Sequence, residues 1–132
     1  MTLIPAEARL TAGRYVPFVH SVFVEGLDLS AATFKGQLRD RWNGGAIRAD
    51  LATVGSASAE GIRFVALTWL NGRPVSELGI RINKSTMVAV PVDQADPEAA
   101  VALVFDIHVE RTATMPEVLL RADFIVQEGS TQ

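Results

Sequence analysis

Cysteine is absent from this 132-residue chain. Its absence excludes disulfide bonds, thiolate metal sites and thiol nucleophiles, and it agrees with assembly in a reducing cytoplasm. No run of about 18 apolar residues occurs, and the first ten residues lack the basic start and apolar core of a signal peptide. We therefore expect a protein that neither spans a membrane nor enters that secretion route.

Positive charge is also scarce, since the net charge is −3 and the isoelectric point is about 5.3. The chain has no general attraction for phosphate backbones, so we do not expect nucleic acid as a partner. Aspartates are scattered singly near turns, and neither a calcium-loop nor a phosphate-loop spacing occurs. We expect no metal ion and no cofactor.

What is present is ordinary globular composition, with 48% hydrophobic and 20% charged residues. A chain of this length fits one domain with one core. Pro5 and Gly13 delimit a lead-in arm over residues 1–13, and residues 14–132 form the domain.

The closing third of the chain indicates the fold. Apolar residues alternate along Val101–Glu110 and again along Val118–Gln127, and a short polar connection joins the two segments. This pattern predicts a hairpin that forms the closing edge of a β-sandwich.

Shorter strands precede this hairpin. The half-solvated segment Thr33–Arg39 leads into Asn43-Gly44, which is a strong hairpin signal because both residues tolerate positive φ. The expected further strands are residues 46–54, 62–70 and 78–82, with a second turn at Asn71-Gly72. Residues 62–70 are apolar on both faces and predict a buried strand. These patterns predict an all-β sandwich of about seven to nine antiparallel strands with an extended N-terminal arm.

Residues 14–24 (RYVPFVHSVFV) are apolar on both alternating faces. Such a strand is buried on both sides or faces a partner. Pro17 cannot donate a ladder hydrogen bond, which favours an edge position or a bulge near the start of the strand. An edge strand with two apolar faces invites contact.

The segment Asn83–Pro91 has two interpretations. Ser85 can cap one helical turn through Thr86–Ala89 that ends before Pro91, or residues 87–92 can form a strand. We favour the helical turn.

Candidate chemistry is sparse. Asp106 and His108 lie two residues apart on one strand face, where a carboxylate beside an imidazole can make a general base. No nucleophile or metal set accompanies them, so we interpret them as surface or interface residues and expect no enzyme.

The aromatic and basic residues have similarly modest interpretations. Trp69 is expected in the core and Trp42, at a turn, is the more exposed tryptophan. Arg39, Arg41, Arg48 and Arg63 either form a basic stripe or alternate with acids on a solvated face, and we favour the second interpretation.

Three segments of the chain form an ordered pattern: Asp28–Phe34 with Gln37–Arg39, then Ser85–Met87 with Pro91, and finally Val104–Val109 with Leu119–Val126. Together they resemble the small immunoglobulin-like β-domain of tail, baseplate and fibre-attachment proteins of tailed bacteriophages, the type found at the N-terminus of upper baseplate proteins. The resemblance covers roughly residues 15–128 and implies an immunoglobulin-like sandwich. Ala31 and Ala122 stand where the family pattern has glycine.

The family has no catalytic residues, so the resemblance implies a non-enzymatic structural part of a phage or prophage virion, assembled in the host bacterial cytoplasm. Its expected partners are other tail or fibre proteins and further copies of itself. The alternative is a carbohydrate- or other ligand-binding module centred on Trp42. The expected interface residues are Leu3, Ile4, Leu10, Tyr15, Val16, Phe18, Val22 and Trp42.

Overall fold

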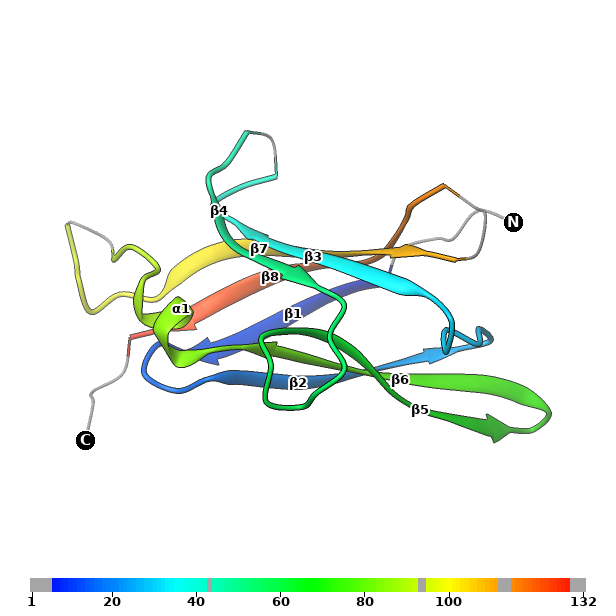
Figure 1. The fold of residues 1–132 in the computed structure, drawn as a ribbon. Helices are drawn as coiled ribbons and strands as arrows, with labels where there is room; N and C mark the ends of the chain where they lie inside the picture. Colours follow the sequence, from blue (N-terminus) through cyan, green and yellow to red (C-terminus); the bar gives the residue numbers. More distant parts are fainter. Residues whose placement is uncertain (1–5, 43, 93–94, 112–114, 129–132) are drawn as a thin grey trace.

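The chain folds into two β-sheets packed face to face (Figure 1). The computed structural model describes residues 6–42, 44–92, 95–111 and 115–128. The larger sheet has five strands in the order β1-β8-β7-β3-β4, and the smaller has three in the order β2-β6-β5. The strands are β1 (Ala6–Gly13), β2 (Phe18–Glu25), β3 (Thr33–Arg39), β4 (Ile47–Ala52), β5 (Gly61–Leu70), β6 (Arg73–Ile82), β7 (Val101–Glu110) and β8 (Glu117–Gln127).

This strand order is that of an immunoglobulin-like sandwich. In that fold the second, fifth and fourth strands face a sheet made from the third, sixth and seventh, and variable-type domains add a strand to the latter sheet. Here β2, β6 and β5 face β3, β7 and β8, and β4 is the added strand beside β3. The expected all-β sandwich is therefore confirmed.

The first strand corrects two expectations. Residues 6–13 do not form an arm outside the domain, because β1 pairs with β8 along its whole length, from Ala6 opposite Leu120 to Gly13 opposite Gln127. This pair is parallel, so the sheets are not purely antiparallel. It also makes β1 the edge of the larger sheet and places the β7–β8 hairpin inside it, so the expectation that this hairpin closes the sheet was wrong.

The predicted strand over residues 14–24 is likewise divided. Arg14–Pro17 form the turn by which the chain crosses from the larger sheet to the smaller one, and β2 begins at Phe18. Pro17 lies immediately before β2, and β2 is an edge strand of the smaller sheet, as its proline indicated.

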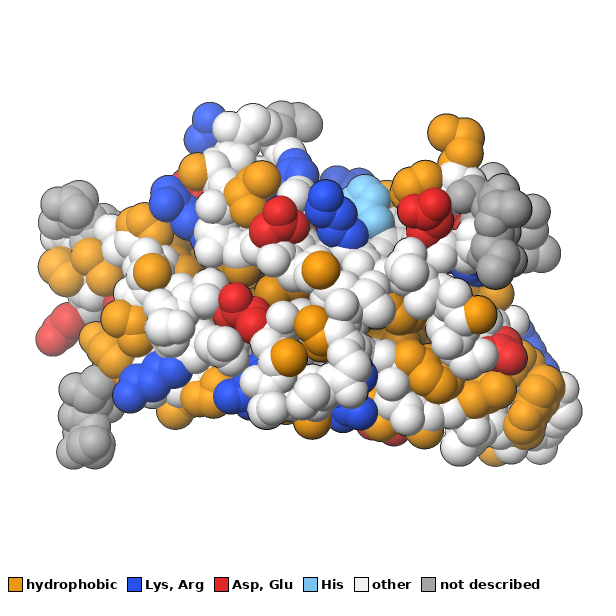
Figure 2. All heavy atoms as spheres, in the orientation of Figure 1, with side chains coloured by type: hydrophobic (Ala, Val, Ile, Leu, Met, Phe, Trp, Pro, Cys, Tyr) orange, Lys and Arg blue, Asp and Glu red, His pale blue; other side chains and the backbone are white. Residues whose placement is uncertain are grey.

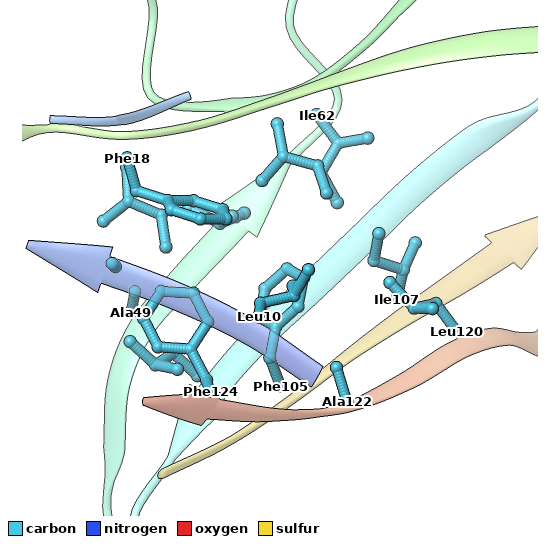
Figure 3. Close-up of a cluster of buried hydrophobic side chains, with 14 of the residues drawn as sticks. Leu10, Phe18, Ala49, Ile62, Phe105, Ile107, Leu120, Ala122 and Phe124 are labelled. Carbon is cyan, nitrogen blue, oxygen red and sulfur yellow. The ribbon is translucent and has the colours of Figure 1, made fainter. Parts of the chain in front are cut away.

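Alternation of side chains fills the space between the sheets with aliphatic and aromatic groups (Figure 3). The ring of Phe124 packs edge-on against Phe18 from the smaller sheet, with centroids 4.9 Å apart, and lies 6.0 Å from the ring of Phe105. Phe105, Ile107 and Ile62 are fully buried.

The segment after β6 contains one short helix, α1 (Lys84–Val88), so the helical turn was the correct alternative. Its cap is not Ser85. Asn83 occupies the N-cap, but its side chain makes no capping hydrogen bond and instead accepts one from Arg81 Nε at 2.9 Å. The Glu60 carboxylate accepts hydrogen bonds from the Asn83 N–H and the Thr86 hydroxyl, both at 2.7 Å. A residue from the β4–β5 loop thus stabilises the start of α1.

The β5–β6 hairpin extends past the end of the larger sheet (Figure 1). Its turn is the predicted Asn71-Gly72, and both residues adopt positive φ, 52° and 77°. β6 is longer than the expected residues 78–82, because Arg73 and Pro74 already pair with β5. The overhang leaves the far end of β5 uncovered, so this strand is buried only near its start.

Candidate functional site

The outer face of the larger sheet carries a ladder of polar side chains. The strand register places one residue from each strand side by side across the whole sheet. Neighbouring side chains on one face lie close enough to interact, and the acidic and basic groups alternate across β7, β8 and β1. The row, from edge to edge, is Asp50, Gln37, Asp106, Arg121 and Glu7.

Asp106 and His108 are neighbours on this face, as the sequence predicted. Asp106 Oδ2 lies 3.2 Å from His108 Nε2, and the two side chains are 14% and 42% exposed. The second oxygen, Oδ1, is buried without a hydrogen-bond partner in the described part of the chain. Among those residues no hydroxyl hydrogen-bonds to His108, and no three histidine and acidic side chains gather as a metal ion requires.

An open cleft of about 550 Å³ lies beside this pair. The Arg39 guanidinium donates to the Gln37 side-chain carbonyl there, although Arg39 Nε is buried without a partner among the described residues. Polar and apolar groups both line the cleft, so it can hold polar groups. Its lining includes Thr33, Phe34, Lys35, Gln37, Arg39, His108, Val109, Glu110 and Pro116.

Trp42 lies over the same sheet rather than projecting into solvent. It is half-buried, and the Arg121 guanidinium lies 4.5 Å from the centroid of its ring. Cation–π contacts of this kind hold one ring face against the cation. Trp42, Arg121, Glu7 and Asp123 line a shallow hollow of about 250 Å³.

The four arginines do not form one basic stripe, in agreement with the favoured interpretation. Arg39 lies on the larger sheet and Arg63 on the smaller one. Arg48 makes a bidentate pair with Asp40, at 2.8 and 2.7 Å. The hydrogen bond from Arg48 lowers the pKa of the Asp40 carboxyl, and the same bond raises the pKa of Arg48.

Several expected interface residues belong to the core instead. Leu10 and Phe18 are only 6% and 7% exposed, because both point between the sheets, so their assignment to an interface was wrong. Val22 is partly buried and packs against the same core. Leu3 and Ile4 lie outside the described residues.

Tyr15 and Val16 are exposed, so their place in an interface stays a prediction. They lie on the turn between the sheets and are 39% and 55% exposed.

The outer face of the smaller sheet carries exposed apolar side chains among charged ones, which include Arg63, Glu77 and Arg81. Val19, Phe23 and Leu70 are 65%, 64% and 57% exposed, and the alternation of the strands puts all three on the side away from the core. Val75 and Ala66 lie between them on β6 and β5. We call these five residues the outer patch: Val19, Phe23, Ala66, Leu70 and Val75.

Trp69 corrects a further expectation, because it is 63% exposed rather than in the core. It faces the inner side of the smaller sheet opposite Pro74, but at the overhanging end of the hairpin. Hydrophobic side chains gather at that end of the molecule (Figure 2).

Two buried polar side chains, Ser76 and Arg14, fix segments next to these surfaces through hydrogen bonds. Ser76 is fully buried, and its hydroxyl accepts a bond from Leu29 N–H at 2.9 Å and donates to the Leu27 carbonyl at 2.7 Å. It thereby fixes the loop from β2 to β3 beneath β6. In this loop the Asp28 carboxylate accepts bonds from both the backbone N–H and the hydroxyl of Ser30, which lower the pKa of Asp28.

Arg14 is the second of these side chains, and it is only 3% exposed. Its guanidinium binds both carboxylate oxygens of Glu128, at 2.6 and 2.8 Å. It also donates to backbone carbonyls at the end of α1 and just after it, including that of Val88 at 3.2 Å. One side chain thus ties the crossover between the sheets to α1 and to the end of β8.

Comparison with known proteins adds no assignment: no family model and no curated protein matches this sequence. Within the described residues, no helix has the length and apolar character needed to cross a membrane.

Proposed function

We propose that this protein is a non-enzymatic structural component of a bacteriophage or prophage virion, a tail, baseplate or fibre-attachment module that acts by protein–protein docking. The observation that carries this proposal is the outer patch. Three large apolar side chains more than half exposed on one sheet face are typical of a surface that another protein covers. The immunoglobulin-like strand order and the resemblance of three segments to tail modules support the viral setting.

Particle composition tests the viral part of the proposal. Virions should be induced from the bacterium that encodes the gene, purified on a density gradient and analysed by mass spectrometry. We expect this protein in the particles at several copies per tail. Its absence from particles that contain the other tail proteins would contradict the proposal.

A pull-down with the products of neighbouring genes tests the docking part. Replacing Phe23 with Ser removes a large side chain from the outer patch without touching the core. We expect Phe23→Ser to lose the association that the unchanged protein shows. Ile47→Ser is the matched control, since Ile47 is 51% exposed on the edge strand β4 of the other sheet, and it should retain binding.

One observation favours a second candidate function, glycan binding. Trp42 and Arg121 share the hollow on the larger sheet with the acidic residues Glu7 and Asp123, and an aromatic ring beside polar groups is a common sugar-binding arrangement. Binding on a glycan array that disappears in a folded Trp42→Ala variant, but persists in Phe23→Ser, would favour this function over docking.

A further inference from the structure

We propose that strand β2 pairs with β2 of a second copy of this chain, antiparallel and about a two-fold axis through Ser21, so that two smaller sheets join into one of six strands. This inference names the occupant of the β2 edge and so deepens the proposed docking role. It rests on the contrast between β2 and the other three edge strands.

In natural proteins, charged side chains, bulges or a short length keep an edge strand from pairing with a strand of another molecule. Strand β1 directs Glu7 and Arg9 outward, and β4 has only six residues and a register shift against β3. Strand β5 has a register shift between Phe64 and Ala66. These three edges are therefore poor templates for a further strand.

Strand β2 lacks these protections except for one charge, Glu25 at its end. Its eight residues pair with β6 without a register shift, and its sequence FVHSVFVE contains no lysine, arginine or proline. Its inner side is also incompletely covered, since His20 is exposed and Val22 is only partly buried. A neighbouring strand would cover side chains on both faces of β2.

The alternation of side chains restricts the register. Directly opposite residues in an antiparallel pair point to the same face, so an outer residue must meet an outer residue. An axis through Ser21 puts Val19 opposite Phe23 of the second copy, twice, and Ser21 opposite itself. Moving the axis to Val22 would instead set Glu25 against Val19, which pairs a carboxylate with an apolar side chain.

The charges beside β2 suit the axis through Ser21. On β6, Glu77 lies beside Phe23 and Arg81 lies beside Val19. In the joined sheet each apolar Phe23–Val19 pair is therefore flanked by Glu77 of one copy and Arg81 of the other. No like charges face each other across the junction, and Ser21 at its centre lies beside Gly79, over which the side chain of Val65 packs.

The contact is modest in size. A single strand pair buries less than the roughly 1,200–2,000 Å² of a stable interface, so we expect a dissociation constant in the micromolar range. Such an association suits a protein held at high local concentration by an assembly.

Cysteine cross-linking tests both the pairing and its register, because the chain has no cysteine of its own. Directly opposite Cα atoms lie about 4.5–5.5 Å apart, within the range that a disulfide spans. With diamide as the oxidant, Ser21→Cys should form a covalent dimer at high micromolar protein. Val19→Cys, on the same face of the same strand, should not, since its two copies would lie roughly 13 Å apart.

A mixture of Val19→Cys and Phe23→Cys proteins should give the heterodimer in preference to either homodimer. Equal cross-linking of all these variants would show random collision and overturn the proposed register. Failure of Ser21→Cys to cross-link, together with a monomer in sedimentation velocity at high micromolar concentration, would overturn the dimer itself.

A lysine introduced on the β2 edge tests the dimer independently of cross-linking. Val19→Lys should weaken dimerisation of the full chain by at least about tenfold, because two-fold symmetry introduces the lysine twice. Ile47→Lys on the β4 edge should leave dimerisation unchanged. Equal effects of both variants would contradict the assignment to β2. A monomeric protein found in virions would defeat only this inference, and a dimer absent from virions would defeat only the viral role.

Discussion

The outer face of the five-stranded sheet is crossed by a ladder of charged and amide side chains. That of the three-stranded sheet also has charged residues, such as Glu77 and Arg81, but large exposed apolar side chains lie among them: Val19, Phe23 and Leu70. Both sheets bury their inner faces against the same core. The difference is therefore not required by folding, because a solvated face needs no large apolar groups. It is the basis of our proposal that another protein covers the outer face of the smaller sheet.

The largest expected effect comes from uncoupling the two sheets at the crossover. Arg14→Ala leaves the buried Glu128 carboxylate and several backbone carbonyls without their cation, so we expect a loss of about 3–5 kcal/mol in the free energy of unfolding. Urea denaturation measures it. Arg9→Ala, on the exposed side of β1, should change stability by less than about 0.5 kcal/mol, and an equal loss in both variants would contradict the role of Arg14.

The next largest effect tests the packing between the two sheets at Gly36. A methyl group on Gly36 of β3 would lie 2.8 Å from Ile62 Cδ1 and 3.3 Å from Phe105 Cζ. We expect Gly36→Ala to destabilise the fold by about 1–3 kcal/mol through overpacking. Gly55→Ala is the control, because its added methyl group would meet no atom within 4 Å. Its thermal denaturation should be close to that of the unchanged protein. Recovery of stability when Ile62→Val is added would locate the clash between the sheets.

A comparable loss is expected where the smaller sheet holds the β2–β3 loop. Ser76→Ala removes the partner of both the Leu29 N–H and the Leu27 carbonyl, so we expect a cost of about 1–3 kcal/mol in urea denaturation. Ser21→Ala on the exposed face of the same sheet is the control. A neutral Ser76→Ala variant would show that the loop does not depend on this hydroxyl.

The smallest expected effect is the pH dependence of the ion pair between Asp40 and Arg48 on the larger sheet. The pKa of Asp40 is lowered in the folded protein by Arg48, so the stability from this pair is present above the ordinary aspartate pKa and is lost as pH falls through the lowered value. The difference in unfolding free energy between the protein and Asp40→Asn should therefore be constant near neutral pH and shrink on acidification below that range. A difference that grows with acidification would contradict the sign of the shift.

Local pattern predicted much of the fold. Alternation alone located β3 and β7 at their observed bounds, and Asn71-Gly72 marked the turn of the β5–β6 hairpin, because period and turn chemistry are properties of neighbouring residues. Strand β1 escaped prediction because its partner, β8, lies more than a hundred residues along the chain. Arg14 and Glu128 are separated by 114 residues for the same reason.

For the candidate surfaces too, the sequence predicted what depends on neighbouring residues and not what depends on contacts between strands. Residues two apart on a strand, such as Asp106 and His108, were placed together from sequence, but the polar ladder depends on register between strands and was not. Trp69 was assigned to the core because its apolar neighbours imply burial, and only the overhang of the hairpin leaves it exposed. The edge position that Pro17 favoured is the one β2 occupies, but the expected interface named Phe18, which is buried, and omitted Phe23, which is exposed.

The contrast between the two sheets is tested most directly by hydrogen–deuterium exchange of the edge strands, measured by mass spectrometry from low to high micromolar protein. If β2 is the edge that a second copy covers, its amides should exchange more slowly as concentration rises, while those of the β4 edge keep the same rate. Equal rates in β2 at all concentrations, or equal slowing in β2 and β4, would contradict the account.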